Sequence, residues 1–294
     1  MFRVCITGAN GFLGNRFLEL NKNKYKIYKI SFNPKRKSSY NLKSKKDFNN
    51  LKKFLKKKKI DYFINFGWSH IANPNSKIHI KKNIIYFKKL IKILNTLQIK
   101  KFISIGSIDE YRKVGNLDEN SGLLNYKSKN FYAYSKILVY KYLKKNYKRS
   151  FLHLRIPNVY GFKKNKKFLI NKVFLLSKKY NLRKKVNLTN LNQERIYIYL
   201  DDLIKIIDKV SFDTSIKDII NIGKGKSISI REYIDIYLKI LKKNKYKHKF
   251  NFNMEKKLKK FSFQSKKYKF ANFRRNLKFN LEQTLKKQED YFNS

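Results

Sequence analysis

Short apolar runs alternate with amphipathic segments over roughly the first half of the chain. Residues 61–66 form one continuous apolar run, whereas residues 78–97 repeat apolar side chains at the spacing of one helix face. We expect strands at residues 2–7, 25–32, 61–66, 102–105 and 151–156, and helices at residues 11–20, 48–55, 78–97 and 131–147. Continuous apolar strands separated by helices are typical of a parallel sheet covered on both faces.

The pattern therefore predicts an α/β fold with a doubly wound parallel (Rossmann) sheet that binds ligands at the carboxyl ends of its strands. After Gly161 the alternation changes, and residues 242–269 are basic and aromatic without clear periodicity. We expect a helical stretch to about residue 180, strands at 196–199 and 219–222, helices from Asp201 and Ser229, and a last helix at 281–292. We assign residues 1–161 to a dinucleotide-binding domain to which residues 195–222 return, and residues 162–294 mainly to a smaller substrate-binding domain.

The chain has a net charge of +53, from 72 Lys and Arg against 19 Asp and Glu. This charge suggests a binding protein as an alternative function. A basic protein on a Rossmann scaffold could bind nucleic acid or an anionic surface. The lysines, however, run through nearly every segment, and the scarcity of Pro and Gly is typical of AT-rich coding. We therefore expect most lysines to be solvated and no specific nucleic-acid partner.

Other sequence features bear on the compartment and on metal binding, and the cytoplasm is the expected location. Cys5, the single cysteine, lies in the first expected strand and cannot form an internal disulfide. No apolar run approaches a membrane span, and the chain begins with a strand rather than a signal peptide. No Cys, His and Asp cluster has the spacing of a metal site, so we expect no metal.

Three of the ten glycines lie in the first fourteen residues, in the turn between the first strand and the first helix. This turn holds a dinucleotide when one glycine makes it tight, a second lets the backbone approach a pyrophosphate and a third lets the helix pack closely. The pyrophosphate then lies at the helix N-terminus. The predicted cofactor-binding residues are Gly8, Asn10, Gly11, Phe12, Leu13 and Gly14.

Tyr132 and Lys136 are candidates for acid–base chemistry. Four residues apart, they share one helix face, and a cation beside a phenol lowers a pKa that is ordinarily ~10. The same spacing recurs at Tyr25, Tyr140, Tyr160 and Tyr180, so spacing alone is uninformative. Position distinguishes Tyr132, because it opens the helix after the fourth strand, and Ser107 follows that strand.

The end of the second expected strand bears on the choice of cofactor. An acidic residue there would bind the ribose 2′-hydroxyl of NAD, but residues 31–37 contain no carboxylate. Arg36 could instead meet a 2′-phosphate, which favours NADP(H) over NAD(H). His70, in the loop after the third strand, is interpreted as structural.

In order along the chain, these motifs resemble an extended short-chain dehydrogenase/reductase of the nucleotide-sugar epimerase/dehydratase family. The likeness rests on the glycine turn at 7–14, on residues 63–67, 104–107 and 154–161, on Tyr132 with Lys136, on Arg195 with Asp201 and Asp202, and on residues 221–229. The resemblance implies a nucleoside-diphosphate sugar substrate, a homodimer, and Phe66 and Gly67 beside the cofactor.

The resemblance also implies the role of each site residue. Tyr132 would be the acid–base, Lys136 would lower its pKa and hold the nicotinamide ribose, and Ser107 would hydrogen-bond the reacting sugar oxygen. Asn158 and Arg195 would lie near the diphosphate, where the planar fork of an arginine suits phosphate. By this likeness, hydride transfer at a sugar carbon, C4, is the expected reaction.

Two departures from the family pattern favour an epimerase or reductase over a dehydratase. Gly106 stands before Ser107 where the family often has a second serine, and Ile108 separates Ser107 from the Asp109–Glu110 pair that dehydratases place directly after the hydroxyl residue. One step along a strand or turn reverses a side chain. Residues 106–111 also resemble reductases of 4-keto-6-deoxy sugar nucleotides. Asp109 and Glu110 remain candidate substrate contacts. A non-catalytic NADP sensor is a further alternative function for the chain.

Overall fold

The computed structural model describes residues 1–33, 35, 38–125, 130–162, 171, 173–175, 186–188, 193–241, 250–252, 259–269 and 277–293. The chain forms two compact units. The first contains residues 1–112, 119–156 and 202–222, and the second contains residues 113–118, 157–201 and 223–294.

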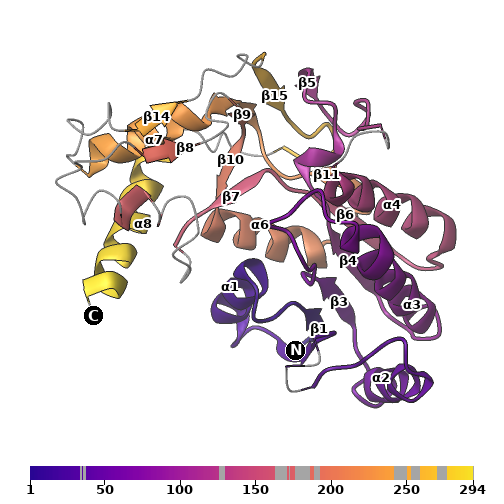
Figure 1. Ribbon diagram of the computed structural model, residues 1–294. Coiled ribbons are helices and arrows are strands. Elements are labelled where there is room, and N and C mark those ends of the chain that lie inside the picture. The colour runs from indigo at the N-terminus through magenta and orange to yellow at the C-terminus, as the bar shows by residue number, and fades with distance from the viewer. Residues whose placement is uncertain are drawn as a thin grey trace. The chain divides into compact units, whose positions relative to one another are not determined.

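The first unit is built on a six-stranded parallel sheet with the order β11-β6-β4-β3-β1-β2 (Figure 1). The strands are β1 (Arg3–Thr7), β2 (Lys26–Ile30), β3 (Tyr62–Asn65), β4 (Lys101–Ile105), β6 (Phe151–Arg155) and β11 (Asp218–Asn221). The doubly wound parallel sheet predicted from the apolar runs is confirmed. The strand order reverses between β1 and β3, and such a switch point is where open α/β sheets bind ligands.

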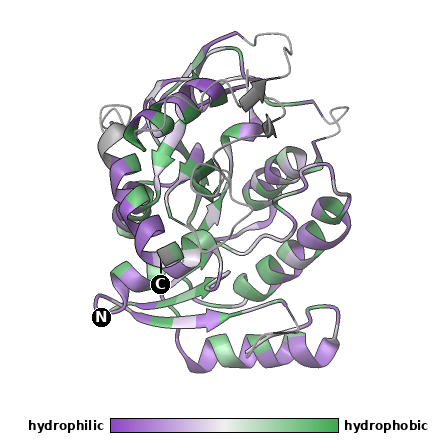
Figure 2. Ribbon diagram, turned by 60° about the vertical axis from the view of Figure 1, so that its left-hand side comes forward, coloured by the Kyte–Doolittle hydropathy of each residue, from purple (hydrophilic) through white to green (hydrophobic). Residues whose placement is uncertain are grey.

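Helices cover the sheet of the first unit. They are α1 (Phe12–Asn21), α2 (Lys45–Lys57), a π-helix (His79–Ile84) that continues as α3 (Ile85–Leu94), a short 3₁₀-helix (Ile108–Glu110), α4 (Phe131–Asn146) and α6 (Leu200–Phe212), which begins in the second unit. Buried side chains of α2, α3 and α4 form one core with strand residues such as Phe63 and Phe102. On individual helices hydrophobic and hydrophilic residues alternate, as expected of helices with one buried face (Figure 2).

In its described residues, the second unit contains short strands and two long helices. Its elements are β5 (Gly115–Leu117), β7 (Asn158–Tyr160), β8 (Val186–Leu188), β9 (Glu194–Arg195), β10 (Tyr197–Tyr199), β12 (Gly225–Lys226), β13 (Ile228–Ser229), α7 (Ile230–Ile240), β14 (Phe250–Phe252), β15 (Phe261–Phe263) and α8 (Leu277–Asn293). They pair as a three-stranded sheet, β12-β15-β5, and as the pairs β10-β7, β13-β9 and β14-β8. Its core includes Tyr197 stacked on Tyr233, with ring centroids 4.3 Å apart.

Most element predictions are confirmed, and the differences have local causes. The helix expected at 48–55 begins earlier, at Lys45, because the Ser44 side chain caps it by accepting the Asp47 N–H. The helix expected at 78–97 is a π-helix followed by an α-helix that ends at Leu94. Residues 242–269, which showed no periodicity, contribute β14 and β15, and most of the helical stretch expected before residue 180 lies outside the described residues. None of the described helices combines the length and the hydropathy that a membrane-spanning segment requires.

The close packing of α1 on the glycine turn predicts the effect of an alanine at Gly14. A Cβ there would lie 2.3 Å from the Gly8 carbonyl oxygen, so the backbone would have to move. We expect Gly14→Ala to lower the free energy of unfolding by about 1–3 kcal/mol, despite the better helix propensity of alanine. Urea unfolding followed by tryptophan emission measures this. Gly122→Ala is the matched control, because the nearest atom would be 4.0 Å from its Cβ; an equal loss in both variants would contradict the packing argument.

Candidate functional site

A cleft of about 1050 Å³ opens in the first unit at the switch point of the sheet. It is lined by the ends of β1, β2 and β3, the glycine turn and part of the π-helix: residues 7–11, 27–33, 38, 54, 65, 67–70, 82, 83, 86 and 87. This volume lies at the upper end of the usual range for ligand sites. The described lining contains Lys29, Lys82 and His70 but no carboxylate.

The glycine turn closes the cleft at its β1 end. Gly8 has φ +69°, and a Cβ there would lie 2.7 Å from the Gly67 N, so only glycine fits both the backbone and the space. The Thr7 hydroxyl donates to Asn65 Oδ1 (2.6 Å) and accepts the Gly67 N–H (2.9 Å), which fastens β1 to the loop after β3. Gly11 is the N-cap of α1 and has no side chain to cap the first turn. The glycine turn therefore leaves room for its backbone to approach an anionic ligand group closely.

The structure separates the predicted cofactor residues into two groups. Gly8, Asn10, Gly11 and Gly67 line the cleft. Gly14 packs under the turn, Phe12 and Leu13 are half-buried in α1, and Phe66 packs on Phe17 with ring centroids 5.4 Å apart. Arg36 lies outside the described residues. His70 lies exposed in the loop after β3, with φ +62°.

The structure brings Ser107, Tyr132 and Lys136 together in the first unit. Ser107 follows β4 and caps the 3₁₀-helix, where its hydroxyl accepts the Asp109 N–H (3.1 Å). Helix α4 begins one residue before Tyr132, because the Asn130 side chain caps it by accepting the Ala133 N–H (3.0 Å). The Ser107 hydroxyl lies close enough to the Tyr132 phenol to lower its pKa through a hydrogen-bonding interaction.

The surroundings of Tyr132 keep its phenol protonated. Burial raises the pKa of Tyr132 above its ordinary value of 10, and the negative charge of Asp109 raises it further. The hydrogen bond with Ser107 acts in the opposite direction without overcoming them. At neutral pH Tyr132 is therefore a proton donor.

Lys136 is almost fully buried, one helical turn after Tyr132. Its Nζ donates to the Ile105 carbonyl oxygen (2.9 Å), lies 3.9 Å from the centroid of the Trp68 ring, and lies 5.6 Å from that of Tyr132. Burial lowers the pKa of Lys136 to about 7, against an opposing effect of Glu110. Sequence reasoning missed Trp68; a signal was available, since this single tryptophan stands three residues after β3, at the switch point.

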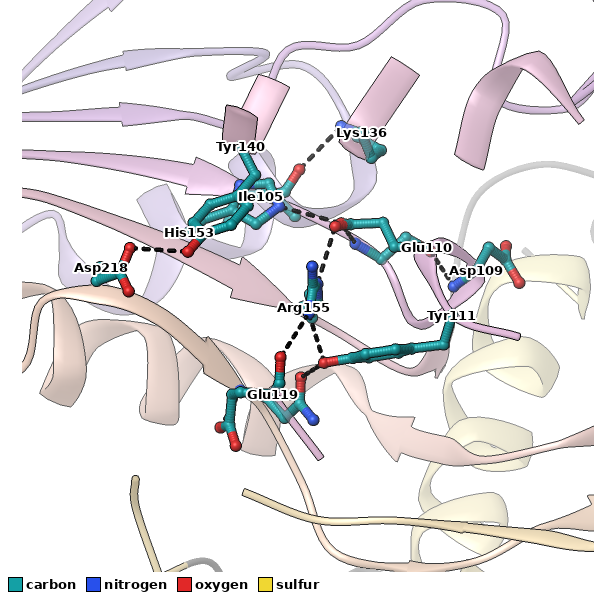
Figure 3. Close-up of polar contacts among 12 residues, drawn as sticks. Ile105, Asp109, Glu110, Tyr111, Glu119, Lys136, Tyr140, His153, Arg155 and Asp218 are labelled. Carbon is teal, nitrogen blue, oxygen red and sulfur yellow. Dashed lines mark hydrogen bonds and ion pairs between the residues drawn. The ribbon is translucent and has the colours of Figure 1, made fainter. Parts of the chain in front are cut away.

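A buried polar network lies behind the Ser107 turn (Figure 3). Glu110 is at its centre: Oε1 accepts the Ser107 N–H (2.9 Å) and the His153 Nε2–H (3.0 Å), and Oε2 accepts the Arg155 Nε–H (2.9 Å). Arg155 Nη1 also donates to the Tyr111 hydroxyl (2.6 Å), which in turn donates to Asn221 Oδ1 (2.8 Å). The network thus joins β4, β6 and β11 beneath the candidate catalytic serine.

Glu110 is ionised and His153 neutral in this network. Burial opposes the charge of Glu110, but the hydrogen bond from His153, the Arg155 guanidinium and the Ser107 N–H hold its pKa well below its ordinary value. Burial lowers the pKa of His153, and its buried Nδ1 has no hydrogen-bond partner, as fits a neutral ring with its proton on Nε2. Glu110 is fully buried, so it does not contact a substrate; Asp109, half-buried, has its charge near Tyr132.

Gly106 is explained by the same network. A Cβ at this position would lie 2.4 Å from His153 Nε2 and 2.5 Å from Glu110 Oε1. The glutamate carboxylate and the histidine ring fill the space that a side chain would need. Gly106 stands where the family often has a second serine, and Glu110 is displaced by one residue from its family position. These two departures are therefore one structural feature.

The remaining predicted residues lie in the second unit. Asn158 is on β7, where its backbone N–H (2.9 Å) and side-chain amide (3.2 Å) both donate to the Ile196 carbonyl oxygen. Arg195, on β9, precedes Ile196 and donates to Gln193 Oε1. The two candidate diphosphate residues are thus neighbours within that unit. Among the described residues, no group of three or more His, Cys, Asp and Glu side chains is placed to hold a metal ion.

A family model described as the NAD dependent epimerase/dehydratase family matches residues 4–223. A UDP-N-acetylglucosamine 4-epimerase from Methanobrevibacter ruminantium M1, in complex with UDP-N-acetylmuramic acid, is similar with a TM-score of 0.75 at 22% identity, over 97% of each chain. The dTDP-glucose 4,6-dehydratase DesIV from Streptomyces venezuelae, with NAD bound, is similar with a TM-score of 0.75 at 17% identity, over 99% of this chain and 98% of that one. At these identities the structural likeness establishes the fold alone. The comparison with curated proteins found no match.

The buried Glu110–Arg155 pair predicts an acid-sensitive stability. Because the folded-state pKa of Glu110 (about 2) lies below its ordinary 4.5, the stabilisation is complete above pH 4.5 and is lost as the pH falls toward 2. We expect Glu110→Gln to lower the free energy of unfolding at pH 7 by about 3 kcal/mol and to flatten this acid dependence.

Urea unfolding between pH 7 and pH 2.5, followed by the emission of Trp68 in the same unit, measures both effects. Glu19→Gln is the control, because its ion pair with Arg16 is half-exposed and such pairs contribute about 0–1 kcal/mol. If Glu110→Gln behaved like Glu19→Gln, the network would not hold this part of the fold.

Proposed function

This chain belongs to the NAD dependent epimerase/dehydratase family, and we propose that it reduces or epimerises the sugar of a nucleoside-diphosphate sugar with Tyr132 as its acid–base. The observation that carries the proposal is the placement of Ser107 beside Tyr132, with the Lys136 Nζ 5.6 Å from the centroid of the Tyr132 ring, in the unit that also contains the glycine-lined cleft. The proposed site of reaction is C4 of the sugar.

The cleft fits a nicotinamide dinucleotide. Gly8, Asn10, Gly11 and Gly67 would hold it, since the turn offers backbone where a side chain would block approach. Such a cofactor supplies or accepts a hydride at the sugar carbon when bound. NADP(H) is the proposed form, because the described lining has lysines but no carboxylate for a ribose 2′-hydroxyl.

The protonated phenol of Tyr132 suits the reduction of a keto sugar. A half-buried, protonated phenol can give its proton to the oxygen of a keto sugar as the carbonyl carbon is reduced. Ser107 supports this step by hydrogen-bonding the same oxygen. In an epimerase, Tyr132 would take the proton from the sugar hydroxyl. It would return the proton after the sugar ring has turned its opposite face to the cofactor.

A dehydratase reaction is disfavoured by the position of Glu110. Its carboxylate is buried against Arg155 and His153, so it is not available to a sugar carbon. The structural relatives are named for, or bound to, UDP- and dTDP-linked sugars, and a pyrimidine nucleoside-diphosphate sugar is therefore the proposed substrate. Asn158 and Arg195 are the proposed diphosphate contacts, and a homodimer is the proposed assembly.

Removal of the Tyr132 hydroxyl tests the mechanism. Tyr132→Phe should lower kcat by at least about 10²-fold, the usual contribution of a positioned acid, while NADPH still binds. NADPH oxidation with a panel of nucleoside-diphosphate 4-keto sugars measures turnover, and quenching of Trp68 emission measures binding. Tyr142→Phe is the control on the same helix, packed in the core against Phe87. Full turnover by Tyr132→Phe would refute the proposed role.

Removal of positive charge tests the cofactor preference. We expect wild-type protein to bind NADPH more tightly than NADH, and Arg36→Ala or Lys29→Ala to weaken NADPH by about tenfold with little effect on NADH, because a charged hydrogen bond contributes about 1.5–3 kcal/mol. Dissociation constants from Trp68 quenching measure this. Lys141→Ala, an exposed change on α4, controls for the general loss of charge. Equal affinity of the wild type for both cofactors would reverse the assignment.

A further inference from the structure

Trp68 contacts the candidate catalytic lysine directly. It is the single tryptophan of the chain, it lines the cleft, and the ring lies 3.9 Å from Lys136 Nζ. The Nζ also donates to the Ile105 carbonyl oxygen (2.9 Å), so it is held between one backbone acceptor and one aromatic face. A buried ammonium over an indole face is an especially favourable cation–π contact.

His79 fixes the indole from its edge. Trp68 Nε1–H donates to His79 Nδ1 (3.1 Å), and His79 Nε2 is 3.0 Å from the Asn73 carbonyl oxygen. An indole N–H only donates and a carbonyl only accepts, so the imidazole is neutral with its proton on Nε2. His79 is fully buried, and burial, aided by the charge of Lys136, lowers its pKa. The orientation of Trp68 is therefore determined by a ring that cannot turn over without losing two hydrogen bonds.

The same segment also holds Tyr132. The His79 ring meets the Tyr132 ring edge-on, with centroids 5.4 Å apart, and the Pro74 carbonyl oxygen accepts the Tyr132 N–H (2.8 Å). His79 opens the π-helix, a rare element that occurs often at functional sites. Residues 68–79 thus contact both members of the Tyr132–Lys136 pair.

We propose that Trp68, fixed by His79, is a positioning residue that holds the Lys136 ammonium beside the ring of Tyr132. The proposal rests on the proposed function for its catalytic meaning, but the contact itself exists in the cofactor-free protein. Trp68 would keep Lys136 charged in a buried position and would form the wall of the cleft beside it.

The charge balance at Lys136 supports this role. The groups that face it are Tyr132 on its own helix, Trp68 after β3, His79 on the π-helix, Glu110 on the 3₁₀-helix and His153 on β6. Burial lowers the pKa of Lys136 to about 7, and Glu110 acts against that. An indole face stabilises the ammonium, so its removal should lower the pKa by roughly one further unit.

Trp68 emission reports the contact directly. In cofactor-free protein we expect the emission to change with a midpoint near pH 7 as Lys136 loses its proton, and this change to disappear in Lys136→Met. Lys141→Met, an exposed lysine on the same helix, should retain it. A transition below pH 6.5 from His79 should persist in both variants. A change near pH 7 that survives Lys136→Met would overturn the proposal.

A second measurement removes the ring. With ¹³Cε-labelled lysine, the Lys136 resonance is identified by its loss in Lys136→Met, and its titration midpoint should fall by roughly one unit in Trp68→Leu and by less in Trp68→Phe, which keeps an aromatic face. The alkaline limb of kcat should move to lower pH by the same amount, because turnover needs the charged lysine. An unchanged midpoint in Trp68→Leu would overturn the proposal. If Trp68→Leu does not fold, Trp68→Phe and the emission titration decide.

These outcomes are separate from the proposed function. Absence of turnover with every keto sugar would refute the proposed reaction, while the emission and resonance titrations of the cofactor-free protein would still confirm or refute the Trp68–Lys136 contact.

Discussion

The buried charge of Glu110 is the constraint on which the candidate catalytic edge of the sheet depends. Removing a carboxylate from water costs several kcal/mol unless partners replace the water. Here Ser107, in the turn after β4, and His153 and Arg155, both on β6, replace that water. The turn after β4 is thereby restricted to one arrangement. In that arrangement the Ser107 N–H donates to the carboxylate, and the Ser107 side chain lies beside Tyr132.

A second set of contacts fixes the other side of the same pair. Residues after β3, from Trp68 to His79, contact α4 at Tyr132 and Lys136. The site of the first unit is therefore assembled at the carboxyl ends of β1, β3 and β4, where the doubly wound topology places ligands. The polar groups of this site are held by buried neighbours. They therefore do not depend on the long exposed side chains of the lysines in which this chain is so rich.

Local patterns predicted the parallel sheet and the glycine turn, because both follow from spacing and steric need within short segments. The network of Glu110 could not be predicted in this way, since it depends on which residues of β6 and β11 the strand register brings near the turn. The π-helix was also missed, because apolar spacing over residues 78–97 does not distinguish it from an α-helix. The short strands β5 and β15 pair with each other from distant parts of the chain, and too few residues form each to give a pattern.

A side chain at position 106 would extend into space that Glu110 and His153 already fill. The history of this turn is therefore constrained: a serine at position 106 becomes tolerable only after the residues at 110 and 153 have both made room, and a glutamate at 110 beside a histidine at 153 can arise only where position 106 is already glycine. The three positions should co-vary among relatives as a linked set, and a single substitution transferred between two such lineages would be harmful in either direction.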